Sequence, residues 1–387
     1  MTLMLASVAD AAEAEIALIE GADVLDLKDP ANAPLGALPR AAIEAVVATI
    51  GRRRLVSAVA GNLSDPQELA AVAEEIANTG VDYVKVGLDA NAPACIEALK
   101  PLAARTRLIG LLFADQDADL SLIPRLAAAG FKGVMLDTAT KDGSRLINYL
   151  DIPRLQQFVG LVHAAGMIAG LAGSLEAPDI ARLLPIGPDL LGFRGALTGG
   201  KGRAKRIDAA HVRLIRDLIP RENHSDDLGD EFKVDWRLLS ARGYAPGRDQ
   251  EVETDRVFVH DLVLPVSIGA YDFERNKTQR VRFNIDADVR CAGHHAEDMR
   301  DVFSYDVIVD AIRLIFSRGH VDLVETVAER IADALLAHPR LVAIKVRVEK
   351  LDVIEGSVGI EISRARASQT VKLHQLFAGD LGAKSGG

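Results

Sequence analysis

Short apolar runs alternate with amphipathic helical patterns over the first 220 residues of the chain. The runs have the length of buried strands, and the segments between them repeat apolar residues at helical spacing. One helical segment, 66–78, opens with Asp65-Pro66, a capping residue followed by proline at the first helical position, and another spans 148–165. We expect strands at 2–6, 24–28, 54–60, 82–87, 107–113, 132–137, 167–171 and 189–193.

Strands that alternate with helices in this way build a parallel sheet. Eight strand–helix units in about 220 residues are typical of a compact (β/α)8 barrel. A doubly wound open sheet is the alternative, but no Gly-rich dinucleotide turn follows the first expected strand. We therefore predict an α/β fold of the (β/α)8, TIM-barrel type for residues 1–220.

The pattern changes after the barrel. Residues 221–255 hold ten Asp or Glu against five Lys or Arg, which predicts an acidic linker, with one short helix around Trp236 to Leu239. Residues 256–366 then show two long alternating strands, two helices at 304–318 and 323–337, and two further strands, which is the order of a smaller α+β domain with an antiparallel sheet. The tail, 367–387, is expected to be frayed.

Composition narrows the class of protein. The net charge of −10 argues against nucleic acid as a main partner. Cys95 and Cys291 lie far apart and without metal-ligand spacing, so a reducing, cytoplasmic location is the simplest expectation. The N-terminus lacks the basic region of a signal peptide, and no run approaches the ~18 apolar residues of a membrane span.

Acidic residues and lysines recur where the expected barrel strands end. Asp26 and Lys28 lie in VLDLKDP, Lys85 in VDYVKVGL, and Asp137 and Lys141 in MLDTATKDG. Residues two apart in a strand share a face, so Asp26 and Lys28 point the same way. A lysine ammonium that lies near other cations is easier to deprotonate. The resulting free amine can attack a carbonyl to form a Schiff base. The alternative is that these are structural ion pairs.

Glycine-rich segments follow the seventh and eighth expected strands, at 172–174 and 192–203. Glycines let backbone N–H groups approach an anion, and loops after these strands are the usual phosphate position in such barrels. A simple turn is the alternative, but beside the lysines the loops indicate a phosphorylated carbonyl substrate. The candidate groups are Gly173, Ser174, Arg194, Gly195, Lys201 and Arg203.

Residues 1–218 closely resemble the (5-formylfuran-3-yl)methyl phosphate synthase family. The resemblance rests on motifs that occur in order, namely DLKDP, LGA (35–37), YVKVGL, MLDTATKDG, LAGS and GFRGA. It implies condensation of two glyceraldehyde 3-phosphate molecules into a furan aldehyde phosphate, a methanofuran precursor, in the manner of class I aldolases and without a metal. It also implies a catalytic set of Asp26, Lys28, Lys85, Asp137 and Lys141.

The resemblance leaves open which lysine forms the imine. We favour Lys28, because Asp26 beside it can manage its proton, and Lys85 is the rival. Two departures are modest: Asp29 stands where Asn is common, and the barrel is shorter between the fourth and fifth strands. Neither removes a candidate catalytic residue.

Sparse polar residues mark the C-terminal domain: Glu274 in IGAYDFE, Tyr305 in FSYDV, Glu325 in LVETVAERIA and Lys350 in VRVEK. Taken singly, Glu325 is an ordinary carboxylate at a helix N-terminus and Lys350 an ordinary solvated lysine. Their order over 256–364, however, resembles the dihydroneopterin aldolase family and its tunnelling fold.

That resemblance implies a role for each residue. Glu325 would hold the guanidine-like edge of a pterin, Lys350 and Tyr305 would transfer protons in a retro-aldol cleavage without an imine, and Glu274 would lie near the substrate side chain. The products would be 6-hydroxymethyl-7,8-dihydropterin and glycolaldehyde. Family sites form between subunits, so a homo-oligomer is implied. Leu351-Asp352 stands where folate-pathway members usually have Pro, which puts the loop shape and substrate preference in question.

We therefore predict a bifunctional enzyme that acts on glyceraldehyde 3-phosphate and on 7,8-dihydroneopterin, without a cofactor and without nucleic-acid or membrane partners. Two alternatives stay open. The barrel could be another class I aldolase or isomerase of phosphorylated aldehydes. The C-terminal domain could be a non-catalytic pterin-binding or oligomerisation module.

Overall fold

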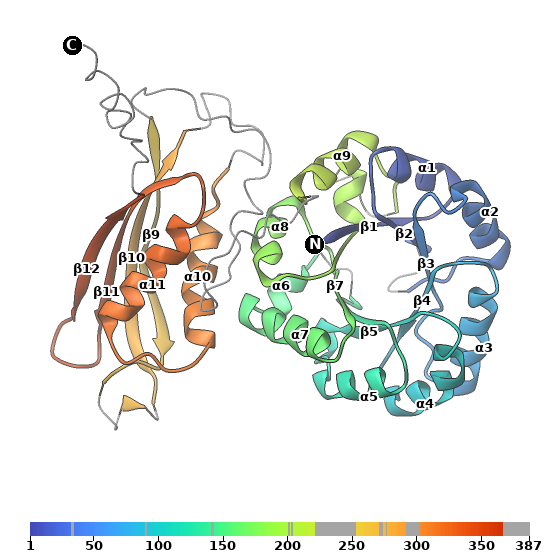
Figure 1. Cartoon of the computed structure of the whole chain (residues 1–387), viewed down its shortest axis with the longest axis horizontal. Helices are drawn as coiled ribbons and strands as arrows, with labels where there is room; N and C mark the ends of the chain where they lie inside the picture. Colours follow the sequence, from blue (N-terminus) through green and yellow to red (C-terminus); the bar gives the residue numbers. More distant parts are fainter. Residues whose placement is uncertain are drawn as a thin grey trace, which may run out of the picture.

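The chain folds into a closed parallel barrel followed by a four-stranded antiparallel sheet with helices on one face (Figure 1). The computed structural model describes residues 1–31, 35–89, 91–140, 143–199, 202, 204–220, 253–270, 274–275, 277–291 and 302–366. The predicted fold class is confirmed. The tail and nearly all of the expected linker, including Trp236 to Leu239, lie outside the described residues, so the domain limits stay a prediction.

The barrel strands follow one another around the ring in chain order, and the last pairs with the first. Every strand expected from the sequence is present, and no end differs from the prediction by more than two residues. The strands are β1 (Leu3–Val8), β2 (Val24–Leu27), β3 (Leu55–Val59), β4 (Tyr83–Gly87), β5 (Leu108–Phe113), β6 (Gly133–Asp137), β7 (Ile168–Leu171) and β8 (Leu190–Phe193).

Helices surround the barrel, and local sequence sets where they begin. Asp65 caps α3 as predicted, because its carboxylate accepts hydrogen bonds from the backbone N–H groups of Gln67 and Glu68. The helices are α1 (Ala11–Ile19), α2 (Arg40–Ile50), α3 (Pro66–Ala77), α4 (Ala92–Ala103), α5 (Ile123–Ala128), α6 (Leu146–Tyr149), α7 (Ile152–Ala164), α8 (Ala177–Leu183) and α9 (Ala209–Leu218). Short 3-10 turns are η1 (Ala114–Gln116), η2 (Leu120–Leu122), η3 (Leu184–Ile186) and η4 (Gly195–Thr198).

The helical stretch expected at 148–165 is confirmed over α7, but its first residues belong to a separate short helix, α6. Leu150 between them is extended, and the Asp151 carboxylate accepts from the backbone N–H of Arg154 to start a new helix. Pro153 has no N–H to continue the earlier helix, so the chain restarts here.

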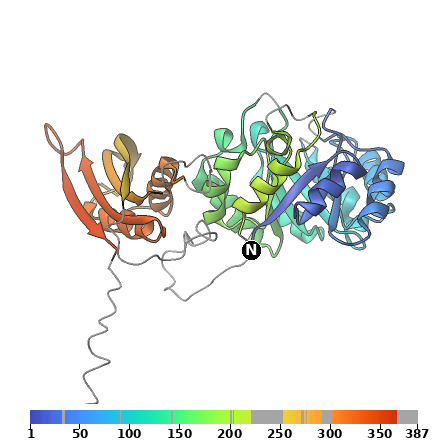
Figure 2. The same cartoon turned by 90° about the horizontal axis from the view of Figure 1, so that it is seen from above.

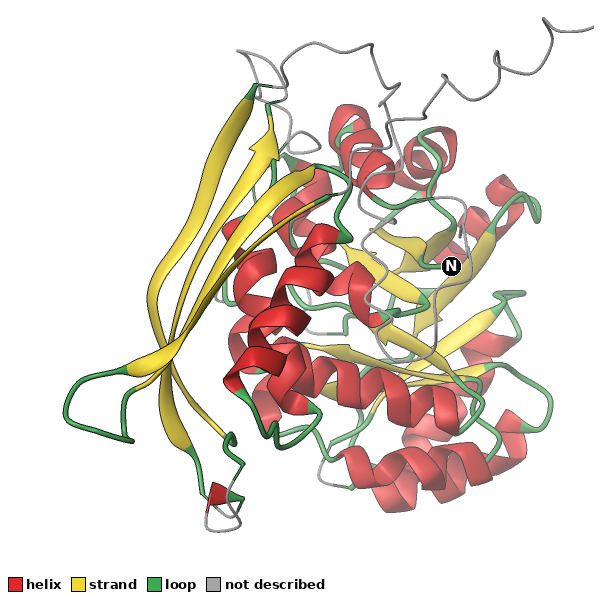
Figure 3. Ribbon diagram, turned by 60° about the vertical axis from the view of Figure 1, so that its left-hand side comes forward, coloured by secondary structure: helices red, strands yellow, loops and turns green. Residues whose placement is uncertain are grey.

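The second unit is a sheet in the order β12-β11-β10-β9, with α10 and α11 on one face (Figure 3). Side chains of β10 alternate in burial, and Val281, Phe283 and Ile285 pack toward the helices. Predicted strands and helices are again confirmed. They are β9 (Thr254–Val266), β10 (Gln279–Arg290), α10 (Tyr305–Ser317), α11 (Val324–Leu336), β11 (Leu341–Lys350) and β12 (Val358–Ala365).

The two units lie side by side, and α10 packs against α7 and α8 of the barrel (Figures 1 and 2). Among the described residues, no helix combines the length and apolar character needed to span a bilayer. Within the same residues, no cluster of three or more His, Cys, Asp or Glu side chains is arranged to hold a metal ion.

Candidate active sites

Asp26 is the centre of the polar network inside the barrel. Its side chain is fully buried at the end of β2, and its Oδ1 lies 2.6 Å from Lys85 Nζ while its Oδ2 lies 3.8 Å from Lys28 Nζ. The hydroxyls of Ser57 and Ser7 donate to the same carboxylate at 2.7 and 3.3 Å. The strand register causes this convergence, because Ser7, Asp26 and Ser57 are direct neighbours on β1, β2 and β3.

The network changes the acidity of both partners. Burial by itself would raise the pKa of Asp26, but the ammonium groups of Lys85 and Lys28 outweigh it and lower that pKa. Burial lowers the pKa of Lys85, against the opposing effect of the Asp26 carboxylate. Lys85 is thus the amine that gives up its proton more easily than an ordinary lysine, which is a property of lysines that do acid–base or imine chemistry.

All the predicted barrel residues that the structure describes line one pocket of about 150 Å³ at the mouth of the barrel. Gly143 also lines this pocket. Lys141 comes two residues earlier and lies outside the described residues. Lys201 and Arg203 of the glycine-rich loop lie outside them as well. The residues that the pocket brings together are Asp26, Lys28, Lys85, Asp137, Gly173, Ser174, Arg194 and Gly195.

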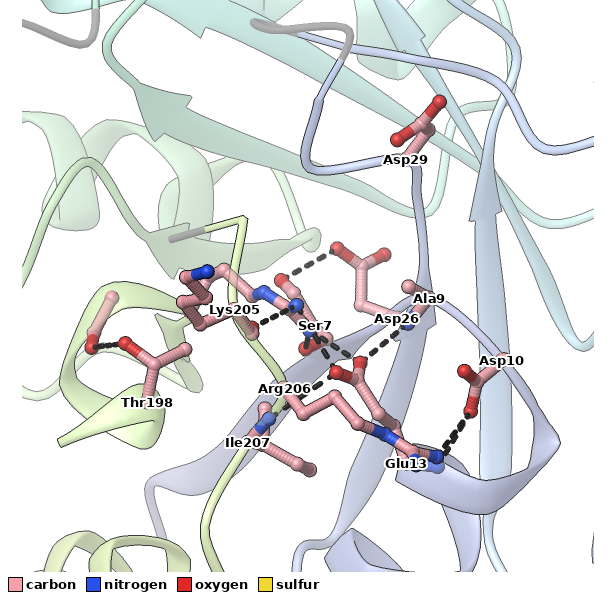
Figure 4. Close-up of polar contacts among 12 residues, drawn as sticks. Ser7, Ala9, Asp10, Glu13, Asp26, Asp29, Thr198, Lys205, Arg206 and Ile207 are labelled. Carbon is pink, nitrogen blue, oxygen red and sulfur yellow. Dashed lines mark hydrogen bonds and ion pairs between the residues drawn. The ribbon is translucent and has the colours of Figure 1, made fainter. Parts of the chain in front are cut away.

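Arg194 has a different environment from the one expected. Its guanidinium donates to the buried Glu13 carboxylate, at 2.5 and 3.2 Å, and to the carbonyl oxygens of Ser7 and Lys205. Glu13 also accepts from the backbone N–H groups of Ala9 and Ile207 (Figure 4). The Glu13–Arg194 ion pair therefore joins the loops after β1 and β8, and much of the Arg194 charge is balanced inside the protein.

Sequence reasoning missed Glu13, because it looks like an ordinary acidic residue in the first turn of α1. It also missed Ser7 and Ser57, whose role depends on strand register. Asp115 was missed too: its two carboxylate oxygens accept from the backbone N–H groups of Ala139 and Thr140 at 2.7 and 2.6 Å. Burial raises the pKa of Asp115, but these bonds outweigh it and lower the pKa overall. Asp115 thus anchors the loop that leads to Lys141.

The loop after β7 is in an uncommon conformation. Ser174 has a φ of 53° and Gly173 a φ of 113°. A left-handed conformation costs a non-glycine residue about 1 kcal/mol, so the surrounding structure must hold Ser174 in place. A side chain at Gly173 would come within 2.9 Å of Thr138 Cγ2, which means that the loops after β6 and β7 are closely packed.

The second unit has its own buried charged cluster. Lys350 Nζ lies 2.9 Å from Glu274 Oε1, and the Gln279 side-chain amide donates to the same oxygen at 2.6 Å. Gly269, at φ 137°, lies so close that a Cβ there would be 2.1 Å from Glu274 Cδ. The structure thus brings Glu274 and Lys350 together, as two of the four predicted residues.

The other two predicted residues lie on the surface of the single chain. Glu325 is exposed in the first turn of α11, four residues after Val321, which bridges Ile268 beside Gly269. Tyr305 is 61% exposed at the first residue of α10. Tyr305 follows closely on Phe303, whose ring contacts His338 near the Leu341 end of β11, whereas Lys350 is the last residue of that strand. One chain does not bring Tyr305 to Lys350.

A lysine-bearing pocket at the mouth of a (β/α)8 barrel, joined to an α+β sheet domain, is typical of an enzyme that acts on a small molecule. A family model described as 4-HFC-P synthase matches residues 4–216, and one described as dihydroneopterin aldolase matches residues 257–363. The chain belongs to the 4-HFC-P synthase family, and its C-terminal part matches the dihydroneopterin aldolase family.

Individual relatives are similar to one or the other part of the chain. A Methylorubrum extorquens relative is 43% identical over 211 residues, which is 54% of this chain and 88% of the relative. The (5-formylfuran-3-yl)methyl phosphate synthase of Methanosarcina mazei is 36% identical over 233 residues, covering 56% of this chain and 97% of that protein. Dihydroneopterin aldolase from Burkholderia thailendensis, solved with bound guanine, is 32% identical and covers 29% of this chain and 92% of that chain, with a TM-score of 0.27.

Proposed function

We propose that the barrel converts two molecules of glyceraldehyde 3-phosphate into (5-formylfuran-3-yl)methyl phosphate, with release of one phosphate and two waters. One observation carries the proposal: a buried carboxylate, Asp26, contacts two lysines, Lys28 and Lys85, inside a pocket that also opens onto glycine loops. That arrangement supplies an amine for a carbonyl, an acid–base pair and backbone donors for phosphate.

Lys28 is the proposed imine-forming residue. Its amine is held more loosely by Asp26 than that of Lys85, at 3.8 Å against 2.6 Å, and it lies just beyond the end of β2. In this scheme the Lys28 amine attacks the aldehyde carbon, and the oxygen leaves as water. The Lys85–Asp26 pair takes up and returns the protons. Asp137, the last residue of β6, and Lys141, four residues further along the chain, would serve the second substrate. The lowered pKa of Lys85 keeps it as the rival for the imine.

The loops after β7 and β8 are the proposed phosphate contacts. Gly173, Ser174 and Gly195 line the pocket and can present backbone N–H groups. Because the Arg194 guanidinium is paired with Glu13, we propose that Arg194 positions the loop after β8. It would not supply the main positive charge that faces the phosphate. A guanidinium that is already paired with a buried carboxylate attracts an incoming anion less strongly.

For the second unit we propose retro-aldol cleavage of 7,8-dihydroneopterin, with glycolaldehyde as one product. Glu274 and Lys350 form a ready proton-transfer pair, and the exposed Glu325 would hold the pterin. The match of residues 257–363 to the dihydroneopterin aldolase family model supports this class of substrate. Tyr305 would have to come from a second copy of the chain, which is why we also propose a homo-oligomer.

Borohydride trapping tests the assignment of the imine. The protein is incubated with glyceraldehyde 3-phosphate, reduced, digested and analysed by mass spectrometry, with Lys28→Arg and Lys85→Arg in parallel. We expect the added mass on the Lys28 peptide in the wild type and in Lys85→Arg, and none in Lys28→Arg. A label on Lys85 in the wild type would transfer the role to that residue. A label obtained only with other phosphorylated aldehydes would favour a different class I aldolase.

Pterin binding and cleavage test the second unit separately. Glu325→Gln should abolish dihydroneopterin binding, whereas Lys350→Ala should keep binding and stop the release of glycolaldehyde. A wild-type protein that binds the pterin but never releases glycolaldehyde would instead support a non-catalytic module.

A further inference from the structure

A buried ion pair joins the two units of the molecule. Arg182 on α8 donates to both carboxylate oxygens of Asp310 on α10, at 2.6 and 2.9 Å. The two side chains are 14% and 4% exposed. Two parallel hydrogen bonds that are largely shielded from solvent fix the relative orientation of α8 and α10 as well as the distance between them. A solvated surface pair does not. Figure 1 shows α8 and α10 facing each other where barrel and sheet unit meet.

The barrel side of this contact belongs to the wall of the barrel pocket. Helix α8 has only seven residues, and the loop before it, 172–176, lines the pocket and contains the left-handed Ser174. A short helix directly after a strained loop determines where that loop ends. Any shift of α8 is therefore passed to the backbone N–H groups around Gly173 and Ser174.

A buried acid on α8, Asp179, contacts the neighbouring loop after β6. Asp179 accepts from the Arg145 guanidinium at 2.9 Å and, through its other oxygen, from the backbone N–H of Glu176. The backbone N–H of Leu146, next to Arg145, donates to the carbonyl of Gly173. One face of α8 thus holds the loops after β6 and β7, and the same helix reaches α10 through Arg182.

We infer that the second unit braces the barrel site: Arg182 and Asp310 are positioning residues that hold α8, and through it the phosphate-side loop, in the binding geometry. The inference deepens the proposed barrel function and rests on it for its kinetic part. Tyr305 lies five residues before Asp310 on α10, so the same pair also fixes the helix that carries this residue of the second unit.

Hydrogen exchange of the whole chain tests the brace without any substrate. The variants are Arg182→Gln, Asp310→Asn and the double variant, with Arg105→Gln as the matched control, because Arg105 pairs with Glu74 on the solvent-exposed side of the barrel. We expect faster exchange in 172–176 for both single variants and no further increase in the double variant. Unchanged exchange in 172–176, with faster exchange only in α10, would overturn the inference.

Kinetics then separate positioning from stability. For Arg182→Gln and Asp310→Asn, KM for glyceraldehyde 3-phosphate should rise at least about fivefold, the lower end of coupling between linked sites, while kcat stays near the wild-type value. Arg182→Lys, which retains the charge, should recover part of the loss. A lowered melting temperature with unchanged KM would mean a merely structural contact. If the wild type does not turn over this substrate, the proposed function fails. The exchange experiment still tests whether the Arg182–Asp310 pair positions the loop 172–176.

Discussion

Among single residues, the proposed barrel chemistry rests on a carboxylate, Asp26, that two lysines share. Asp26 stays charged because Lys85 and Lys28 lower its pKa despite its burial. Lys85, in turn, is easier to deprotonate because burial lowers its pKa. The pair can therefore exchange a proton more readily than an isolated lysine, whose amine stays protonated.

Asp26→Asn should remove this proton transfer. Loss of a positioned acid–base group lowers kcat by about 10²–10⁴-fold, so we expect at least a hundredfold drop with a small change in KM. Asp29→Asn is the matched control, since the Asp29 carboxylate accepts from the backbone N–H of Ala31 in the loop beyond Lys28. Steady-state rates of furan formation measure both. An Asp26→Asn enzyme with wild-type kcat would remove Asp26 from the mechanism.

His338 predicts an acid-sensitive second unit. Burial and the nearby Arg340 and Arg366 lower its pKa to about 3, and its Nδ1 accepts a weak bond from the backbone N–H of Arg340. Unfolded chains bind this proton near the ordinary pKa of 6.5, so stability is present above 6.5 and is lost as the pH falls toward 3. The loss between pH 6.5 and 4 is about 3 kcal/mol.

Denaturant unfolding of the wild type and His338→Gln at pH 8 and pH 4 measures this effect. The wild type should lose more stability between the two pH values than the variant, because only the wild type carries the buried imidazole. The comparison at pH 8, where histidine is neutral in both states, gives the effect of the substitution alone. Equal losses at pH 4 would show that His338 does not titrate as proposed.

At the scale of elements, glycine and register position the second site. Gly269 brings the backbone against Glu274, which in turn holds Lys350 and Gln279. Gly269→Ala would place a Cβ inside the Glu274 carboxylate and would also strain a φ of 137°. We expect loss of pterin cleavage and a second unit destabilised by at least about 1 kcal/mol.

Gly160→Ala in α7 is the matched control for that substitution. Nothing lies within 4 Å of a Cβ at Gly160, and alanine favours a helix by about 0.5–1 kcal/mol over glycine. Its melting temperature should rise or stay the same. A Gly269→Ala protein that unfolds and cleaves like the wild type would contradict the close approach of Gly269 and Glu274.

Sequence alone predicted the elements well, because both units follow simple periodicities. Strands of the barrel are continuous apolar runs, and β10 alternates. The break at Leu150 was missed because α6 and α7 keep a similar apolar pattern on both sides of it. Glu13, Ser57 and Arg182 could not be assigned from sequence, since their partners are 181, 31 and 128 residues away along the chain.

At the scale of the whole molecule, the two candidate sites differ in completeness. The barrel pocket gathers its described residues from one chain. The second site does not, because Tyr305 and Lys350 lie at opposite ends of the unit. If both residues act on one pterin, then two subunits must supply them.

Mixing two inactive variants tests this arrangement. Tyr305→Phe and Lys350→Ala should each lose pterin cleavage, and after joint refolding about a quarter of the sites would combine an intact Tyr305 with an intact Lys350 from different subunits. We therefore expect activity to return in the mixture. No return of activity in mixed oligomers, confirmed by differently tagged subunits, would mean that both residues act within one chain or that one of them is not catalytic.

The proposed barrel reaction is tested by incubating the purified protein with glyceraldehyde 3-phosphate alone, with a chelator and without added metal. Furan-aldehyde absorbance and released phosphate are followed together. We expect both signals to appear in equal amounts, the chelator to leave them unchanged, and Asp26→Asn to abolish both. A folded wild-type protein that produces neither signal would contradict the assignment of the barrel to this reaction.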